Sequence, residues 1–243
     1  MTAPLFLAPT DALHGAGAGD LVVLDGAEGR HAADVRRLRA GEPVDVGDGH
    51  GLLLRGVVAE VGRGRVTVSV QSRVVLPERR PRLVVVQALA KGGRGEDAVE
   101  AMTEVGVDEI VCWQASRSVA RWTERTGSRW VSTAQAAAKQ ARSPWVPRVT
   151  GPATTADVAL RLRAATSGVV LHEDAATALA SLDVPGDGEV VVVVGPEGGV
   201  APDELDAFEA AGARVCRLGD TVLRSSTAGV AALSILNAAT RWR

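Results

Sequence analysis

The stretch VVVVVGPEGG, residues 190–199, joins five consecutive valines to a glycine-rich turn. A continuous β-branched run is typical of a strand that is buried on both faces of a parallel sheet. A helix is predicted after it, because Pro202 suits a first helical position and the acidic Asp203 and Glu204 suit the helix dipole. Ligands of open α/β sheets bind beyond the carboxyl ends of strands, where glycines let the backbone approach them. Taken alone, such a turn is more often a tight connection without a ligand.

A second run of the same design follows closely. VCRLG, residues 215–219, is a strand-like segment that ends in glycine, and Ser225, Ser226 and Thr227 each offer a side-chain cap to a last helix. Arg224 precedes these residues and has no evident structural task, so contact with an anion or a base is plausible, with a surface salt bridge as the alternative. Two neighbouring strands that both end in such loops indicate a pocket between them.

A third glycine loop, LAKGGRGED at residues 89–97, also lies between a predicted strand and a predicted helix. It fits neither the GxGxxG fingerprint nor a Walker loop. Lys91 and Arg94 are candidates for phosphate contact, although solvated basic side chains are somewhat more typical of this spacing.

Strands and helices alternate over residues 82–243, which predicts an α/β domain with a mainly parallel sheet. The expected strands are residues 83–89, 109–114, 168–171, 189–194 and 214–218, and the expected helices are residues 96–105, 129–141, 202–211 and 227–242. Residues 1–75 instead hold short strand-like runs, with one helical candidate at residues 31–38, and indicate a small β-barrel. The stretch 76–82 contains two prolines and four charged residues, which is typical of a linker at a domain boundary.

The balance of charge, 27 lysine and arginine residues against 29 aspartate and glutamate residues, argues by itself against a nucleic-acid binder. Its distribution points the other way, because residues 112–148 carry seven basic residues and one acidic residue. Local positive potential attracts phosphate, and a solvated arginine-rich face explains the pattern equally well. A second basic patch combines His31 with Arg36, Arg37 and Arg39, and it is a candidate for RNA phosphate contact or an ordinary charged face.

Composition also excludes several classes of protein. We find no apolar run of about eighteen residues and no signal peptide, and we therefore expect a cytoplasmic protein without a membrane segment. Cys112 and Cys216 form no CxxC pair, and the four histidines lack metal-ligand spacing, so we expect no metal site.

Taken together, GPEGG at residues 195–199 and LGDTVLRSSTAGVAAL at residues 218–233 resemble the RsmE family of ribosomal RNA uridine-N3 methyltransferases, which belongs to the SPOUT class. The similarity extends over nearly the whole chain. It includes HAADVRRLRAGEPVDVGDGHG (31–51), LAKGGRGEDAVEAMTEVGVDEIV (89–111), SRSVA (116–120), AAKQARSPWVPRV (137–149) and LHE (171–173). No single piece is specific, but the combination in this order is.

The resemblance implies a PUA-like β-barrel RNA-binding domain over residues 1–75 and a SPOUT methyltransferase domain over residues 82–243. The parallel sheet of the second domain would end in a deep C-terminal trefoil knot. The resemblance also implies a homodimer with the active site near the subunit interface, S-adenosyl-L-methionine as cofactor, and 16S ribosomal RNA or the small ribosomal subunit as partner. The implied reaction is methylation of N3 of one uridine, at the position equivalent to 1498.

The family motifs also indicate which residues form the site. The expected cofactor-binding residues are Leu171, His172, Gly195, Pro196, Glu197, Gly198, Gly199, Leu218, Gly219, Leu223, Ser225, Ser226 and Ala228. The expected RNA-binding residues are His31, Arg36, Arg37, Arg39, Lys91, Arg94, Arg117, Lys139 and Arg142.

Arg224 is the expected catalytic residue. Uracil N3 keeps its proton at neutral pH, and the anion formed on its loss spreads charge onto O2 and O4. An arginine beside those oxygens would stabilise the anion, as an oxyanion site does. Because N3 lies on the pairing edge, the target base must be unpaired or turned out of its stack. The general base stays unassigned.

The sequence departs from the family pattern in two places. Ser225 and Ser226 occupy a stretch where the family often has glutamate, which removes one candidate for proton removal or RNA contact. Ala201 stands where a serine commonly caps the helix. Three alternatives remain: another SPOUT methyltransferase that acts on a ribose 2′-OH or on transfer RNA; a dinucleotide-binding oxidoreductase, disfavoured by the missing GxGxxG; and a non-catalytic RNA-binding module, which Ser226 keeps open.

Overall fold

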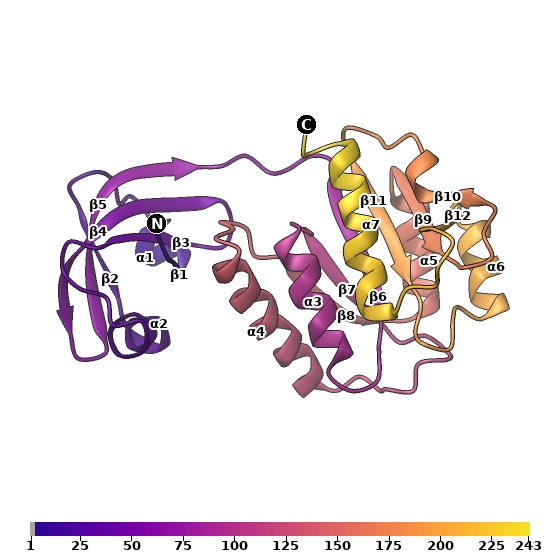
Figure 1. Ribbon diagram of the computed structural model, residues 1–243, viewed down its shortest axis with the longest axis horizontal. Coiled ribbons are helices and arrows are strands. Elements are labelled where there is room, and N and C mark those ends of the chain that lie inside the picture. The colour runs from indigo at the N-terminus through magenta and orange to yellow at the C-terminus, as the bar shows by residue number, and fades with distance from the viewer. Residues whose placement is uncertain (1–2) are drawn as a thin grey trace. The chain divides into compact units, whose positions relative to one another are not determined.

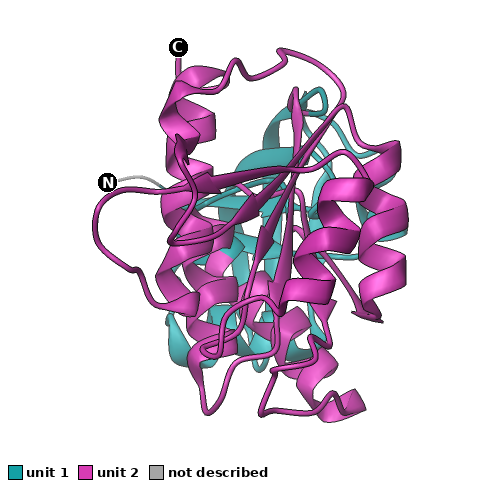
Figure 2. Cartoon of the chain, turned by 90° about the vertical axis from the view of Figure 1, so that its right-hand side faces the viewer, with its two compact units in different colours: residues 1–78, 138–146 teal, residues 79–137, 147–243 magenta. Residues whose placement is uncertain are grey.

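The computed structural model describes residues 3–243, which divide into two compact units (Figures 1 and 2). Unit 1 runs to Glu78 and includes the later segment Ala138–Val146. Unit 2 consists of Arg79–Ala137 and Pro147–Arg243. The chain therefore passes from unit 1 into unit 2, returns to unit 1 for one short segment, and ends in unit 2.

Unit 1 is built on one five-stranded sheet with the strand order β1-β3-β4-β5-β2. The β1–β3 pair is parallel and the other pairs are antiparallel. Alternate side chains of these strands, such as Val44, Val46, Val66 and Val68, are fully buried in a single apolar core. The elements are β1 (Leu5–Leu7), α1 (Thr10–Leu13), β2 (Leu21–Leu24), α2 (Gly26–Arg30), η1 (His31–Val35), β3 (Pro43–Gly47), β4 (Leu52–Gly62) and β5 (Arg65–Val75).

The helical segment of unit 1 differs from the sequence prediction for residues 31–38. The helix α2 already begins at Gly26, and it continues as one π-helical turn, η1, that ends at Val35. Arg37 then adopts a φ of 54°, in the left-handed region that stops a right-handed helix. The predicted bounds of this helix are therefore wrong at both ends.

The segment Ala138–Val146 belongs to unit 1 because its side chains pack there. The Nζ atom of Lys139 donates a hydrogen bond to Oε1 of Glu28 at 2.5 Å. Trp145 lies so close to Gly51 that a Cβ atom at Gly51 would come within 2.4 Å of the indole ring. Glycine is thus required at that position, and the indole closes this part of unit 1.

Unit 2 contains a seven-stranded sheet in the order β10-β12-β9-β11-β6-β7-β8. Every pair is parallel, which confirms the predicted α/β class with a parallel sheet. The strands are β6 (Arg82–Ala88), β7 (Glu109–Trp113), β8 (Arg148–Ala153), β9 (Ser167–Leu171), β10 (Thr177–Ala178), β11 (Glu189–Val194) and β12 (Arg214–Arg217). The helices are α3 (Arg94–Glu104), α4 (Glu124–Gln140), α5 (Thr155–Ala164), η2 (Leu179–Ser181), α6 (Pro202–Ala210) and α7 (Ser225–Ala239).

Helices cover both faces of this sheet, as Figure 2 shows. Along β11, Val190, Val192 and Val194 belong to the core that includes side chains of α3, α4 and α7. Val191 and Val193 point to the other face and belong to the core with α5 and α6. The run of valines is therefore buried on both sides, as a central parallel strand requires.

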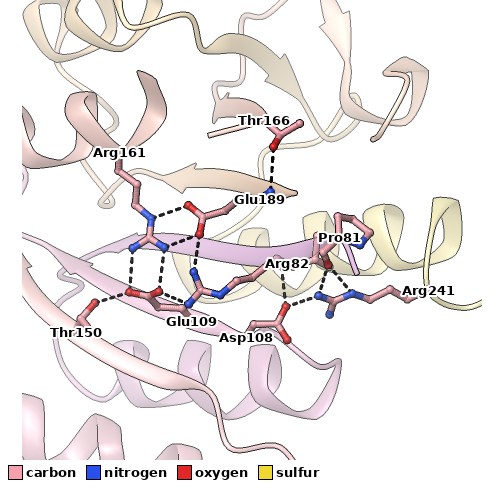
Figure 3. Close-up of polar contacts among 10 residues, drawn as sticks. Pro81, Arg82, Asp108, Glu109, Thr150, Arg161, Thr166, Glu189 and Arg241 are labelled. Atoms are coloured by element: carbon pink, nitrogen blue, oxygen red, sulfur yellow. Dashed lines mark hydrogen bonds and ion pairs between the residues drawn. The ribbon is translucent and has the colours of Figure 1, made fainter. Parts of the chain in front are cut away.

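A ring of ion pairs lies at the amino ends of the central strands (Figure 3). Arg82, Glu109 and Glu189 are the first residues of β6, β7 and β11, and Arg161 reaches them from α5. Each arginine bonds both glutamates, at distances of 2.5–3.0 Å, and Thr150 donates a further hydrogen bond to Glu109. The carboxyl ends of the same strands lie at the opposite end of the sheet, where glycine-rich loops follow them.

Among residues 3–243, no helix combines the length and the apolarity that a bilayer crossing demands.

Candidate functional site

A pocket of about 330 Å³ lies at the carboxyl ends of β9, β11 and β12, beside the first turn of α7. Three loops follow these strands, and all three contribute to its wall. The lining residues are Arg94, Leu171, His172, Glu173, Val194, Gly195, Pro196, Glu197, Gly199, Val200, Arg217, Leu218, Gly219, Thr221, Val222, Leu223, Arg224, Ser225 and Ala228. This size and position are typical of a small-molecule site in a parallel sheet.

Most of the residues expected at the cofactor site gather in this lining. Gly198 and Ser226 are the two expected cofactor residues that fall outside it. Arg224, expected to be catalytic, and Arg94, expected to contact RNA, border the same pocket. Sequence reasoning missed several lining residues: Glu173, Val194, Val200, Arg217, Thr221 and Val222.

The loop after β11 turns sharply at its glycines. A Cβ atom at Gly195 would lie 2.9 Å from the side chain of Val200, and Gly199 has a φ of +73°. A backbone bond from Gly199 N to the carbonyl of Pro196, at 2.9 Å, closes the turn. The sequence therefore needs glycine here to keep the chain close to the pocket.

The helix after this turn, α6, has Ala201 as its N-cap and therefore has no side-chain cap. Glu204, three residues on, is 3 % exposed, and its Oε2 accepts a hydrogen bond from the backbone N–H of Ala201 at 3.1 Å. Its Oε1 accepts from the N–H of Ser116 at 2.8 Å and from the hydroxyl of Thr155 at 3.0 Å. The buried glutamate thus satisfies the N–H of the N-cap residue and also ties the loop after β7 to α6. A serine side chain at position 201 would instead accept from the N–H of Glu204, and α6 lacks that bond.

Two side chains bind the glycine turn to neighbouring loops. Oε1 of Glu197 accepts hydrogen bonds from the backbone N–H of Lys91 at 3.2 Å and from the guanidinium of Arg94 at 3.3 Å. The guanidinium of Arg117 donates to the carbonyl of Gly198 at 3.0 Å. Lys91, Arg94 and Arg117, all expected to contact RNA, therefore lie along the edge of this turn.

The loop after β9 is held by His172 and Arg217. Nδ1 of His172 accepts a hydrogen bond from the N–H of Asp174 at 3.2 Å, so in the neutral ring the proton sits on Nε2, which is a donor. Arg217, at the end of β12, donates to the carbonyl of Ala175 at 2.9 Å and also to that of Ala176. No local sequence signal could have identified Arg217, because its partners lie about forty residues earlier in the chain.

The first turn of α7 corrects the predicted N-cap. The N-cap is Arg224, with no side-chain cap, and the helix begins at Ser225. Ser225 is 8 % exposed, and its hydroxyl oxygen accepts a hydrogen bond from Nε2 of Gln87 at 3.0 Å. Thr227 donates through its hydroxyl to the carbonyl of Arg224 at 3.1 Å. Within residues 3–243, the exposed guanidinium of Arg224 has no hydrogen-bond or ion-pair partner and stays available to a ligand.

The remaining RNA candidates lie in unit 1. The ring of His31 packs edge-on against Phe6, with 5.8 Å between ring centroids. Arg36, Arg37 and Arg39 are exposed in the turn after η1. Lys139 is paired with a carboxylate, as described above, whereas Arg142 is exposed and has a φ of 54°.

The part of the chain that the structure describes, residues 3–243, offers no group of three or more histidine, cysteine, aspartate or glutamate side chains placed to hold a metal ion.

Two family models match the chain. Residues 77–237 match an RNA methyltransferase domain, and residues 24–71 match an RNA methyltransferase PUA domain. The ribosomal RNA small subunit methyltransferase E of Mycobacterium tuberculosis is 44 % identical over 233 residues, covering 92 % of this chain and 89 % of that protein.

Solved structures share the fold. The ribosomal RNA small subunit methyltransferase E of Neisseria gonorrhoeae, solved bound to S-adenosyl methionine, superimposes with a TM-score of 0.86 at 23 % identity and covers 98 % of each chain. A Legionella pneumophila protein solved with bound SAM gives a TM-score of 0.86 at 24 % identity, over 99 % of each chain. Family models, sequence identity and fold agree, and the chain belongs to the RNA methyltransferase family, within the group of ribosomal RNA small subunit methyltransferases E.

Proposed function

We propose that this protein methylates N3 of one uridine in 16S ribosomal RNA, with S-adenosyl-L-methionine as the methyl donor. The observation that carries the proposal is the pocket at the carboxyl ends of β9, β11 and β12. Arg224 borders it and has no hydrogen-bond or ion-pair partner within residues 3–243. The curated relative at 44 % identity over 92 % of the chain supports the ribosomal substrate.

The pocket fits the proposed cofactor. Its wall combines apolar side chains suited to an adenine ring, such as Leu171, Leu218 and Ala228, with polar groups suited to hydroxyl and carboxylate groups. A Cβ atom at Gly219 would meet nothing within 4 Å, so the backbone of that loop is open to a ligand. The Nε2–H of His172 supplies a donor.

The protein would contribute alignment and electrostatic stabilisation. S-adenosyl-L-methionine supplies an electrophilic methyl group on a sulfonium sulfur. In the net reaction the methyl group would pass from sulfur to N3, the N3 proton would be released to solvent, and neutral S-adenosylhomocysteine would leave. The loops around the pocket would hold the reacting atoms in line, which removes much of the entropic cost of the encounter.

Arg224 is the residue we assign to the developing negative charge on the base. Its guanidinium would donate hydrogen bonds to O2 or O4 of the uracil anion. Arg224→Ala should lower kcat by about a hundredfold, as the loss of one oxyanion donor does. Binding of S-adenosylhomocysteine should change little. Near-normal turnover of this variant, with cofactor and RNA bound, would refute the assignment.

The finer architecture implied by the family is part of the proposal. Residues 1–75 would form the PUA-like RNA-binding barrel, and residues 82–243 the SPOUT domain with its C-terminal trefoil knot. The crossovers of the strand order, with β12 placed beyond β9, support such a knot. The active form would be a cytoplasmic homodimer with the site near its interface. Val222 and Leu223, 77 % and 39 % exposed beside Arg224, support a partner surface there.

The test is nucleoside mass spectrometry of ribosomal RNA from cells with and without the gene. Loss of 3-methyluridine, restored by the wild-type protein and not by Arg224→Ala, is the expected result. If 3-methyluridine persists while another methylated nucleoside disappears, the base assignment is wrong. If no nucleoside changes, the catalytic proposal is wrong. Sedimentation equilibrium of the purified protein tests the homodimer.

A further inference from the structure

Gln87 is a polar side chain in an apolar environment. It is 0 % exposed and is the second-last residue of β6, in register with Val194 of β11 and Cys112 of β7. Its neighbours on the same face of the strand, Val85 and Leu89, belong to the apolar core under α3 and α7. The buried Oε1 atom of Gln87 finds no hydrogen-bond partner in residues 3–243. An amide buried in this way costs folding free energy, so packing alone does not explain it.

The amide nitrogen of Gln87 is hydrogen-bonded to a residue of the pocket wall. Nε2 of Gln87 donates to the hydroxyl oxygen of Ser225 at 3.0 Å, across 138 positions of sequence. Ser225 lines the pocket and is the first residue of α7, directly after Arg224. Its hydroxyl makes no helix cap, because α7 has no side-chain cap. The bond to Gln87 therefore attaches the first turn of α7 to the central sheet.

The first two turns of α7 pack tightly beside this bond. A Cβ atom at Gly229 would lie 2.5 Å from Sδ of Met102 and 3.6 Å from Oε1 of Gln87. The backbone N–H groups of Thr227 and Ala228 bind the carbonyl of Arg224 at 2.9 Å, so the arginine follows the position of this turn.

We propose that Gln87 is a positioning residue for methyl transfer, which acts through Ser225 to fix the first turn of α7 and thereby the place of Arg224 at the pocket. The inference rests on the proposed function. Gln87 itself is buried and is not among the residues that line the pocket.

Gln87→Leu separates this role from a structural one, because leucine removes both polar atoms at similar volume. Removal of the unpaired Oε1 offsets the loss of the Nε2 bonds to Ser225 and to the carbonyl of Ala88, so the unfolding midpoint should change little. At the same time kcat should fall about tenfold, the change expected when one hydrogen bond worth about 1.4 kcal/mol is lost. The affinity for S-adenosylhomocysteine, measured by calorimetry, should also fall, because Ser225 forms part of the pocket wall.

Asn237→Leu is the matched control. Asn237 is buried in the last turns of the same helix, and its Nδ2 donates to the carbonyl of Val105 at 2.8 Å. This variant should lose stability while the folded protein keeps its kcat and its affinity for S-adenosylhomocysteine. Gln87→Met replaces Gln87→Leu if the latter does not fold.

A double-variant cycle tests the route through Ser225. If Gln87 acts through Ser225, Gln87→Leu combined with Ser225→Ala should lose no more affinity and no more kcat than Ser225→Ala alone. The inference is overturned if the losses of the two single variants multiply in the double variant. It is also overturned if Gln87→Leu keeps wild-type kcat and affinity, or if its loss of activity only follows a loss of stability. If the wild-type protein forms no 3-methyluridine, the proposed function fails, and the affinity cycle with S-adenosylhomocysteine still decides whether Gln87 acts through Ser225.

Discussion

Replacing Glu109 with glutamine removes one negative charge from the ring of ion pairs in Figure 3 and keeps the shape of the side chain. The Glu109 side chain is 4 % exposed and lies between two arginines, with both oxygens hydrogen-bonded to Arg161. Burial disfavours its charge, but hydrogen bonds and the charge of Arg161, followed by the bonds from Arg82 and Thr150, outweigh burial. The pKa of Glu109 is lowered from 4.5 to about 2.

This lowered pKa sets the size of the expected effect. A change from 4.5 to about 2 corresponds to about 3 kcal/mol of stability at pH 7, at about 1.4 kcal/mol for each tenfold change in the acid constant. Because the folded-state pKa is the lower one, this stabilisation is complete above the unfolded-state pKa and is lost as the pH falls toward 2. At pH 3.5 about 2 kcal/mol of it should remain.

The assay is urea unfolding followed by tryptophan fluorescence, between pH 7.5 and pH 3.5. Glu109→Gln should lower the free energy of unfolding by about 3 kcal/mol at pH 7.5. The difference from the wild-type protein should shrink as the pH falls. Glu209→Gln, at an exposed position of α6, should match the wild-type protein throughout. A difference below about 1 kcal/mol at pH 7.5, the range of an exposed ion pair, or a difference that does not vary with pH, would refute the reasoning.

Four further substitutions test the loops and unit 1. Gly195→Ala should weaken binding of S-adenosylhomocysteine more than tenfold in calorimetry, because its methyl group would meet Val200 at 2.9 Å; unchanged affinity would mean that the turn yields. Arg117→Ala should raise the Kd for S-adenosylhomocysteine about fivefold, because one hydrogen bond to the glycine turn is lost. The salt dependence of RNA binding should stay unaltered. If Arg117 instead contacts a phosphate, the slope of log K for RNA against log salt concentration should fall by about one. Lys139→Ala and Glu28→Gln should each lower the thermal stability of unit 1, because each removes the ion pair of a partly buried side chain. If Lys139→Ala instead weakens RNA binding at unchanged stability, this lysine contacts RNA.

The central strands and the pocket loops could be predicted because their signals are local. The predicted strand 189–194 matches β11 at both ends, and glycines mark where the chain leaves the sheet. The elements that sequence reasoning missed have weak signals. Gly151 and Pro152 interrupt the strand β8, whose residues are exposed or half-buried, and in α5 only Val158 and Leu162 are buried.

Residues whose partners are remote in the chain could not be found in the same way. Gln87 lies inside an apolar run that correctly predicts a strand, and its partner Ser225 follows only from the packing of α7. Ser225 itself fits the sequence pattern of an N-cap, yet its hydroxyl makes no cap and accepts a hydrogen bond from Gln87 of the sheet. In both cases tertiary contacts override the local preference, so only the fold reveals the connection.

The return of residues 138–146 to unit 1 bears on the order in which the protein can fold during synthesis. Domains generally fold as units, the amino-terminal one first, as the chain leaves the ribosome. Here the five strands of unit 1 emerge without Lys139 and Trp145, which follow only after α3, β7 and most of α4 have been made. Until then Glu28 lacks its lysine partner, and no indole ring covers Gly51. A fragment cut after Glu78 lacks both contacts, and we expect the complete first unit to require both pieces of the chain.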